Sequence, residues 1–507
     1  MLPVPQSPPP TVLAPTIRRI GAITLIMLFT AAAVLAIIRR GPWYDEFYTF
    51  YLVRPGTPLS LLWPAWLRDN HPPLFYALAW LWARLLGWCG LSATVEAGRT
   101  INLALLALTV GLMAMIARHD AWFKRLGWYY GVALAAMFPA LDQIDQLRSY
   151  FLSFALTALV LPLLVHHIRC VRPSSRQSLA LGGMLTLAFS VHLVTTVVIA
   201  GLVAGVIILL TLARRRADAA RLTQIAVLAA IPFAISTAMQ LTTLVANTQT
   251  FWIPPGFNGG RWAIETELAG ALGANLVLDL IALAGLGVTL VSATRRDAQA
   301  QTTMMVIIAL TGGLMLALAM LVAVHLHRPL LITRYLVAVD PVVAFVLALG
   351  ACRLARRLPA PAVIASDLAV LAAAALAIHA NLDRTLHQPS WDGTGRVIAA
   401  LVQSCPDTRV YPNMDWNANP RNFPPHDNHE VVPFAYGYVA QRLGFSLALP
   451  GSHDLSHRCP TLFWTEHAND QHPDAQTVIG RLRSAGYPIG SGRMMRIGHG
   501  WILVARP

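Results

Sequence analysis

The chain has 507 residues, of which 56% are hydrophobic and only 12% are charged. This composition excludes an ordinary soluble protein and is typical of a polytopic α-helical membrane protein. The formal net charge is +14, but Lys and Arg occur in small groups at the ends of apolar runs. Cytoplasmic loops that follow the positive-inside rule have this distribution, so we expect a lipid bilayer as partner and no nucleic acid.

The chain begins with a proline-rich segment, residues 1–17, which we expect to be a disordered cytoplasmic lead. An apolar run at about 20–38 follows Arg18-Arg19. The run is too long for a removed signal peptide and lacks a clear small-residue cleavage site. It therefore predicts a first membrane span that leaves the N-terminus in the cytoplasm.

The first external loop, about residues 40–90, is rich in aromatic and ionisable side chains. It opens with Trp43-Tyr44-Asp45-Glu46 and closes with the run from Asp69 to Tyr76, whose sequence is DNHPPLFY. Ionisable groups at a bilayer surface are costly and are usually functional. The apolar run 72–89 is short and contains several Trp, which favours a juxtamembrane helix within this loop over a further crossing.

The basic clusters predict about eleven spans, with the N-terminus inside and the C-terminus outside, since every basic loop then falls on one side. The expected spans are 20–38, 99–117, 127–141, 149–165, a tight pair across 178–212, 222–242, 268–292, 303–324, 335–351 and 361–379. Residues 18–382 would form this transmembrane module.

Residues 383–507 predict a small extracytoplasmic α/β domain. Short alternating runs at 408–411, 461–464 and 501–504 are typical of strands, and 395–403 and 477–484 are typical of helices. If the domain lies outside the cytoplasm, a disulfide between Cys405 and Cys459 is expected. The three other cysteines lie in or beside apolar runs, where cysteine acts as a small apolar residue.

Asp45 and Glu46 form an adjacent carboxylate pair embedded among aromatic residues. Aromatic neighbours can desolvate a carboxylate and raise its basicity, so Asp45 is a candidate general base toward a hydroxyl group. The alternative is a solvated pair in a polar loop.

Asp69 and His71 stand before Pro72-Pro73. The prolines fix the chain and can begin a helix, which would aim both side chains from a rigid turn. The alternative is a helix N-terminus with Asp69 or Asn70 as its cap, which leaves the aromatic-flanked histidine unexplained.

An Asp-Glu pair after the first span, followed by the sequence HPPLFY at the start of a helix, resembles polyprenyl-phosphate-dependent glycosyltransferases of the GT-C superfamily. The nearest branch is that of the protein O-mannosyltransferases and the lipid A aminoarabinose transferases. Supporting motifs follow in order across residues 18–400: Arg99-Thr100-Ile101-Asn102, Gln146-Leu147-Arg148-Ser149-Tyr150, His192, Arg334-Tyr335-Leu336 with Pro341, and Gln388-Pro389-Ser390-Trp391.

The resemblance implies a polyprenyl-phosphate sugar donor, a hydroxyl acceptor and inversion at the anomeric carbon. It implies Asp45 as the base, with Glu46 as its neighbour, and Arg148 and Arg334 as ligands of the donor phosphate. Interfacial snorkelling is the alternative for the two arginines, and a packed, hydrogen-bonded histidine is the alternative for His192. The remaining expected substrate-binding residues are Asp69, His71, Tyr76, Tyr150, His192 and Tyr335.

Some relatives use a divalent metal in the first-loop region. Asp69, His71 and His192 could supply ligands, but no spacing demands it, so no metal site is predicted. A polar surface loop explains the later group His426, Asp427, His429 and Glu430 as well as a metal would.

We therefore expect an enzyme of the inner membrane whose acceptor is a lipid, a polysaccharide or a protein on the periplasmic face. Two other classes of protein are alternatives to this enzyme. A lipid or lipid-linked sugar flippase predicts charges and Gly or Pro breaks near the midplane, together with an internal repeat. Here the acids concentrate at one face and no repeat is found. A structural partner of which only the external domain functions would make the first loop dispensable.

Overall fold

The computed structural model describes residues 13–69, 71–170, 173–249, 253, 256–412, 431–448, 452–466, 474–498 and 500–506. The chain divides into two compact units, which are described separately. The helical unit comprises Met1–Ile38, Trp66–Trp82 and Arg99–Thr385. The sheet unit comprises Arg39–Ala65, Ala83–Gly98 and Leu386–Pro507. Two segments of the predicted first external loop therefore belong with the C-terminal residues.

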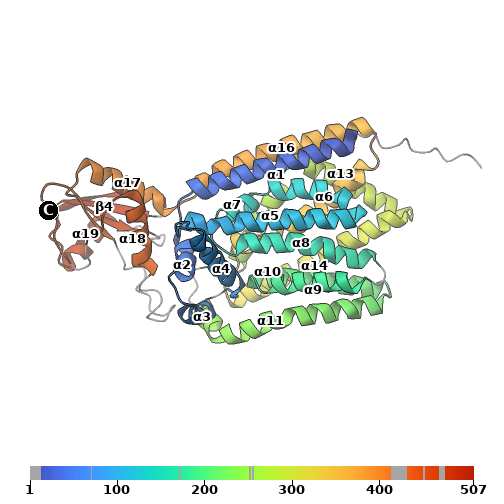
Figure 1. Cartoon of the computed structure of the whole chain (residues 1–507), viewed down its shortest axis with the longest axis horizontal. Coiled ribbons are helices and arrows are strands. Elements are labelled where there is room, and N and C mark those ends of the chain that lie inside the picture. The colour runs from blue at the N-terminus through green and yellow to red at the C-terminus, as the bar shows by residue number, and fades with distance from the viewer. Residues whose placement is uncertain are drawn as a thin grey trace, which may run out of the picture. The chain divides into compact units, whose positions relative to one another are not determined.

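The helical unit is a bundle of long helices that run roughly side by side (Figure 1). Its helices are α1 (Leu13–Arg39), α5 (Val95–His119), α6 (Ala121–Ala136), α7 (Phe138–Ile144), α8 (Tyr150–Arg169), α9 (Ser175–Phe189), α10 (Leu193–Leu212), α11 (Arg216–Gln249), α12 (Phe257–Leu272), α13 (Leu276–Thr294), α14 (Ala298–His327), the 3-10 turn η1 (Thr333–Tyr335), α15 (Asp340–Ala355) and α16 (Ala360–Leu386). Helices α3 (Leu59–Leu67) and α4 (Leu74–Trp88) each have residues in both units, and so do α1, α5 and α16 at one end: residues 95–98 of α5, Arg39 and Leu386 belong to the sheet unit.

The predicted polytopic helical fold is confirmed, and each predicted span overlaps a helix. Two boundaries are wrong: the span 127–141 runs past the end of α6 into α7, and the span 268–292 begins within α12 and crosses the break before α13. Eight helices of the described chain are long and apolar enough to cross a membrane. Helices α6, α9 and α15, with 16, 15 and 16 residues, match the three remaining expected spans, so the number of crossings stays a prediction. The expected juxtamembrane helix is α4, a shorter apolar helix over Leu74–Trp88.

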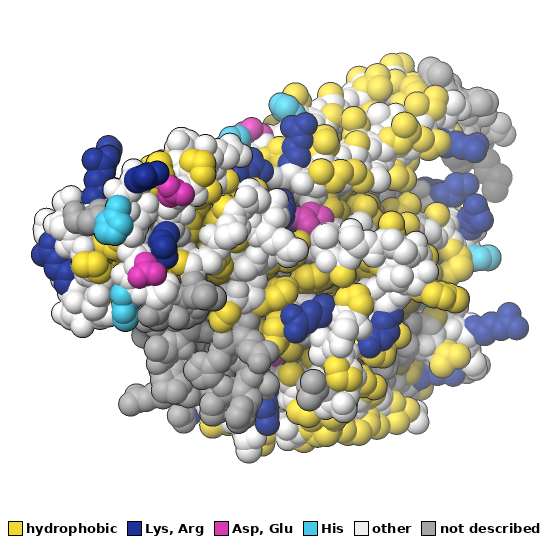
Figure 2. Space-filling model, turned by 60° about the vertical axis from the view of Figure 1, so that its left-hand side comes forward, with side chains coloured by type: hydrophobic (Ala, Val, Ile, Leu, Met, Phe, Trp, Pro, Cys, Tyr) yellow, Lys and Arg dark blue, Asp and Glu magenta, His cyan; other side chains and the backbone are white. Residues whose placement is uncertain are grey.

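The side of the helical unit that Figure 2 shows is largely hydrophobic. Leu179, Leu212 and Leu376 are between 70% and 78% exposed, which would be costly in water but suits contact with lipid.

Glycines allow the closest helix contacts inside the bundle. A Cβ atom added to Gly201 of α10 would lie 2.5 Å from the carbonyl oxygen of Gly313 in α14. Gly285 of α13 and Gly350 of α15 approach each other in the same way. Small residues at such crossings let helix backbones pack closely where lipid gives no hydrophobic driving force.

The C-terminal part of the sheet unit is an α/β domain, as predicted (Figure 1). Its strands are β1 (Arg409–Pro412), β2 (Thr461–Thr465), β3 (Ser491–Ile497) and β4 (Gly500–Arg506), in the spatial order β1-β2-β4-β3. Strands β1 and β2 are parallel, and the other two pairs are antiparallel. Helices α17 (Trp391–Ser404), α18 (Val431–Leu443) and α19 (Ala475–Ser484) complete it, together with α2 (Tyr44–Val53). The sequence interpretation missed β3 and α18.

Alternation along β2 separates two apolar layers, because successive side chains of a strand point to opposite faces. Phe463 packs with Tyr411 and, in the same cluster, with Ile479 of α19. Trp464 packs on the other face with Tyr436 of α18 and Trp391 of α17.

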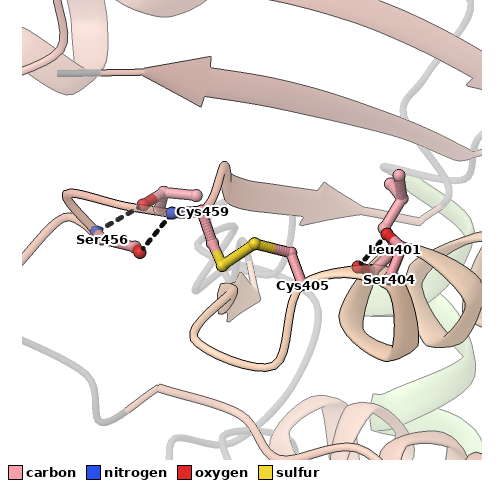
Figure 3. The surroundings of a disulfide bond; sticks show 6 residues. Leu401, Ser404, Cys405, Ser456 and Cys459 are labelled. Carbon is pink, nitrogen blue, oxygen red and sulfur yellow. Dashed lines mark hydrogen bonds between the residues drawn. A yellow bond between two sulfur atoms is a disulfide. The ribbon is translucent and has the colours of Figure 1, made fainter.

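The predicted disulfide is confirmed: Cys405 and Cys459 are bonded, with 5.7 Å between their Cα atoms. The bond joins the end of α17 to the loop before β2 (Figure 3). The side-chain oxygen of Ser456 accepts a hydrogen bond from the amide of Cys459 at 3.0 Å, which fixes the loop beside the sulfur atoms.

Three helices of the bundle are joined through the buried carboxylate of Asp367 in α16. It accepts hydrogen bonds from Arg18 Nε of α1 at 2.7 Å, and from Trp128 Nε1 and Tyr129 Oη of α6 at 3.1 and 2.8 Å. A buried carboxylate with three donors is satisfied, whereas its removal would leave the guanidinium and both donors without their partner.

We predict that Asp367→Ala lowers the free energy of unfolding by about 3 kcal/mol, the cost of breaking a buried ion pair. Thermal unfolding of the purified protein in detergent would measure the change. The matched control is Glu265→Ala, which breaks the exposed pair of Glu265 with Arg261 and should cost less than about 1 kcal/mol. Equal midpoints for the two variants would contradict this account.

Candidate functional site

The turn that carries Asp69 and His71 is held by one buried amide from α11. Gln240 is 1% exposed, and its Nε2 donates to the carbonyl oxygens of Trp66, Asp69 and His71 at 3.0, 3.2 and 2.9 Å. Three backbone acceptors thus converge on one side chain of a distant helix. The turn has a fixed position within the helical unit, as the prolines that follow it predicted.

Asp69 binds two neighbouring side chains. His71 Nδ1 lies 3.2 Å from Asp69 Oδ2, and the hydroxyl of Tyr76 donates to the same oxygen. Arg148, which precedes α8, approaches from the other side, with its guanidinium nitrogens 3.5 Å from Tyr76 Oη and from His71 Nε2. All four side chains are at most 9% exposed. The sequence predicted each of them, and the structure brings them together.

A ring of aromatic side chains adjoins His71. The rings of His71 and His192 are 5.1 Å apart, and those of His192 and Tyr335 are 5.0 Å apart. The ring of Tyr150 lies 5.6 Å from that of His192 and 5.9 Å from that of Tyr335. The buried hydroxyl of Tyr150 has no hydrogen-bond partner within the described ranges, so it is available to a ligand.

Arg148 and Arg334 are the cationic members of this group, which we call the buried polar cluster: Asp69, His71, Tyr76, Arg148, Tyr150, His192, Arg334 and Tyr335. Arg334 is half-buried, and the other members are buried. The guanidinium carbon of Arg148 lies 5.8 Å from the ring centroid of Tyr150, and that of Arg334 lies 5.8 Å from that of Tyr335. A planar guanidinium beside an aromatic ring is weakly hydrated and suited to oxyanion recognition.

The charge states inside the cluster follow from burial and neighbours. Burial alone would raise the pKa of Asp69, but His71, Arg148 and Tyr76 outweigh it and lower the pKa to about 2. Burial, followed by the charges of His71 and Arg148, holds the pKa of His192 well below its usual value. Asp69 is therefore ionised and His192 neutral at pH 7, so Asp69 is a poor proton acceptor there.

His192 is also a helix cap. Its Nδ1 accepts a hydrogen bond from the backbone nitrogen of Val194 at 3.3 Å, at the start of α10. The interpretation as a packed, hydrogen-bonded histidine is therefore confirmed, whereas a role for His192 in a site stays a prediction.

The segment between α7 and α8 is fixed by buried amides that the sequence interpretation left without a role. Asn102 Nδ2 donates to the carbonyl oxygens of Ile144 and Gln146 at 3.0 and 2.7 Å. The carboxylate of Asp142 accepts from Gln143 and from Gln146. Asn102 belongs to the motif Arg99-Thr100-Ile101-Asn102 noted in the sequence. Gln240 was not predicted, because the sequence shows it only as a single amide side chain within an apolar span.

Asp45 and Glu46 lie in the first turn of α2, in the sheet unit. Carboxylates are favoured there by the partial positive charge of a helix N-terminus. Glu46 is completely buried, whereas Asp45 is partly exposed. Of the two predicted acids, only Asp45 is accessible to a substrate. Thr49 Oγ1 donates to the backbone oxygen of Asp45 at 3.1 Å.

The donor set does not fit a divalent metal ion. Within the described ranges, no group of three His, Cys, Asp or Glu side chains is arranged to hold one. Asp69 and His71 bind each other, and the guanidinium of Arg148 reaches His71, which places a cation where a metal would need room. His426, Asp427, His429 and Glu430 lie outside the described residues.

Comparison with known proteins gives the fold. No family model matches the sequence, and no curated protein matches it. The chain is similar to the crystal structure of ArnT from Cupriavidus metallidurans in the apo state, with 14% identity over 96% of this chain and 98% of that one, at a TM-score of 0.54. It is equally similar to that ArnT bound to undecaprenyl phosphate, with 13% identity over 95% of this chain and 97% of that one, at a TM-score of 0.55. The expected resemblance in fold is confirmed.

We predict that Gln240→Ala destabilises the protein by about 2 kcal/mol, because three buried carbonyl groups lose a shared donor. Gln224→Ala is the matched control, since Gln224 is an exposed residue of the same helix and its loss should change little. The two midpoints of thermal unfolding would be compared. If Gln240→Ala unfolded at the control's temperature, the turn would not depend on this side chain.

Proposed function

We propose that this protein is a membrane glycosyltransferase that moves a sugar from a polyprenyl-phosphate donor to a hydroxyl acceptor. The observation that carries the proposal is the buried polar cluster. In this cluster, Arg148 and the Asp69–His71 pair lie among aromatic rings inside a bundle of apolar helices. Buried ionisable groups at such a position are retained for function. The similarity in fold to an ArnT bound to undecaprenyl phosphate supports the same substrate class.

The donor phosphate is the proposed ligand of Arg148 and Arg334. A guanidinium offers a planar fork of donors that matches phosphate oxygens. When the bond between the anomeric carbon and the phosphate oxygen breaks, charge develops on the leaving polyprenyl phosphate. A fixed cation in a water-poor site stabilises that charge without reorganising. The hydroxyl of Tyr150 is a further donor to the phosphate or the sugar.

Asp45 is the proposed general base. In this mechanism the acceptor oxygen attacks the anomeric carbon from the side opposite the phosphate, which gives inversion, and Asp45 takes the acceptor's proton. Two observations favour Asp45 over the other predicted carboxylates. Glu46 is fully buried, and Asp69 is already bonded to His71 and Tyr76. No step of this mechanism requires a metal ion.

The proposed location is the inner membrane, with the N-terminus in the cytoplasm and the C-terminal domain in the periplasm. The Cys405–Cys459 disulfide supports this orientation, since disulfides persist in oxidising compartments. The acceptor, which is a lipid, a polysaccharide or a protein, would then be used on the periplasmic face.

We predict that Asp45→Asn lowers kcat for sugar transfer at least about 100-fold, the usual contribution of a general base. Purified protein would be assayed with labelled undecaprenyl-phosphate sugars and a membrane extract as acceptor. Asp407→Asn, an exposed carboxylate of the same unit, is the matched control and should transfer at the wild-type rate. Near-normal transfer by Asp45→Asn would show that Asp45 is not the general base. If wild type transferred no sugar from any donor, the protein would not be a glycosyltransferase of this class.

A further inference from the structure

Helix α2, which carries Asp45, is too short to hold its own position. It has ten residues, and isolated helices below about 12–15 residues are marginal even in favourable sequences. No side-chain cap stabilises its N-terminus. The direction in which Asp45 points is therefore set by what α2 packs against.

One face of α2 packs against the aromatic residues of α18, a helix of the C-terminal domain that is over 370 residues later in the chain. The ring centroids of Phe47 and Tyr438 are 5.6 Å apart, those of Phe50 and Tyr438 are 5.9 Å apart, and those of Tyr51 and Phe434 are 5.4 Å apart. Aromatic pairs at these separations stabilise a contact beyond the area that they bury. Three pairs spread along one short helix fix its rotation as well as its position.

Both ends of α2 are attached to the same domain. Before the helix, the amide of Trp391 donates to the carbonyl oxygen of Pro42 at 3.0 Å, and the ring of Trp391 lies 5.1 Å from that of Phe47. After the helix, the guanidinium of Arg54 lies 4.2 Å from the ring centroid of Tyr51 and 5.2 Å from that of Phe434. A guanidinium over an aromatic ring is attracted to the face of that ring.

Tyr438 links α2 to a second segment of the sheet unit. Its hydroxyl accepts from the amide of Val95 at 3.0 Å and donates to Glu96 Oε2 at 3.1 Å. Arg442, one turn later on α18, bonds Glu96 Oε1 and Asp392 Oδ2, each at 2.9 Å. The ring of Tyr438 thus contacts α2, while its hydroxyl is held by a charged network.

We propose that Tyr438 is a positioning residue for Asp45, and that the C-terminal domain is thereby part of the catalytic apparatus rather than a separate module. The inference rests on the proposed function for its catalytic consequence. The positional part, that α18 orders α2, stands on the contacts themselves.

The test compares three variants of the full-length protein. Tyr438→Leu removes the ring contacts with α2, and Tyr438→Phe keeps them while losing the hydroxyl bonds. Tyr487→Leu makes the same change as the first variant at an aromatic residue on the opposite face of the sheet, where Tyr487 packs against Tyr411 and Phe463. It controls for general loss of domain stability.

We expect Tyr438→Leu to lower kcat at least about 10-fold, since misplacing a reacting group by about 1 Å can cost 100-fold. The KM for the donor should stay within about twofold, because the proposed phosphate ligands belong to the other unit. Tyr438→Phe should recover most of the rate, and Tyr487→Leu should stay near wild type. Equal losses in the two Leu variants, or no loss in Tyr438→Leu, would overturn the proposal.

Hydrogen–deuterium exchange over residues 44–53 gives a readout that needs no activity. Exchange should accelerate at least about 10-fold in Tyr438→Leu and stay unchanged in Tyr487→Leu. If wild type transferred no sugar but α2 loosened in this way, the proposed function would fail while α18 still ordered α2. If exchange in α2 were unchanged by Tyr438→Leu, the positioning role would be wrong whatever the activity.

Discussion

Burying a carboxylate, two imidazoles and a guanidinium at one place in an apolar bundle is the constraint on which the rest of the helical unit depends. Each of these groups would cost several kcal/mol if it lost its partners. Asp69 therefore bonds both His71 and Tyr76, and the turn that carries it has its carbonyl groups bonded to Gln240. The cluster also contains two guanidinium groups and the Tyr150 hydroxyl, which has no hydrogen-bond partner among the described residues, a combination suited to an oxyanion.

The two units divide the predicted first external loop between them. The half that carries Asp69 and His71 is built into the helix bundle, whereas the half that carries Asp45 packs with the C-terminal domain. In the proposed reaction, the donor ligands and the base would therefore come from separately stabilised parts.

The sequence predicted those features that leave a local pattern. Apolar runs between basic clusters identified the helices, and the run HPPLFY identified the turn at His71. Gln240 was not predictable, because its three acceptors are about 170 residues away along the chain and only the tertiary fold brings them close. Strand β3 was missed because SGRMMRI mixes charged and apolar residues without strict alternation, and the packing of α2 on α18 has no local signature.

Binding of undecaprenyl phosphate to the purified protein tests the central claim, that the buried polar cluster recognises a lipid phosphate. Wild type would be compared with Arg148→Gln and with a control, Arg396→Gln, which changes an exposed arginine of the C-terminal domain. The account predicts at least about tenfold weaker binding for Arg148→Gln, since a charged hydrogen bond is worth about 1.5–3 kcal/mol, and no change for the control. Equal affinity of Arg148→Gln and wild type would contradict it.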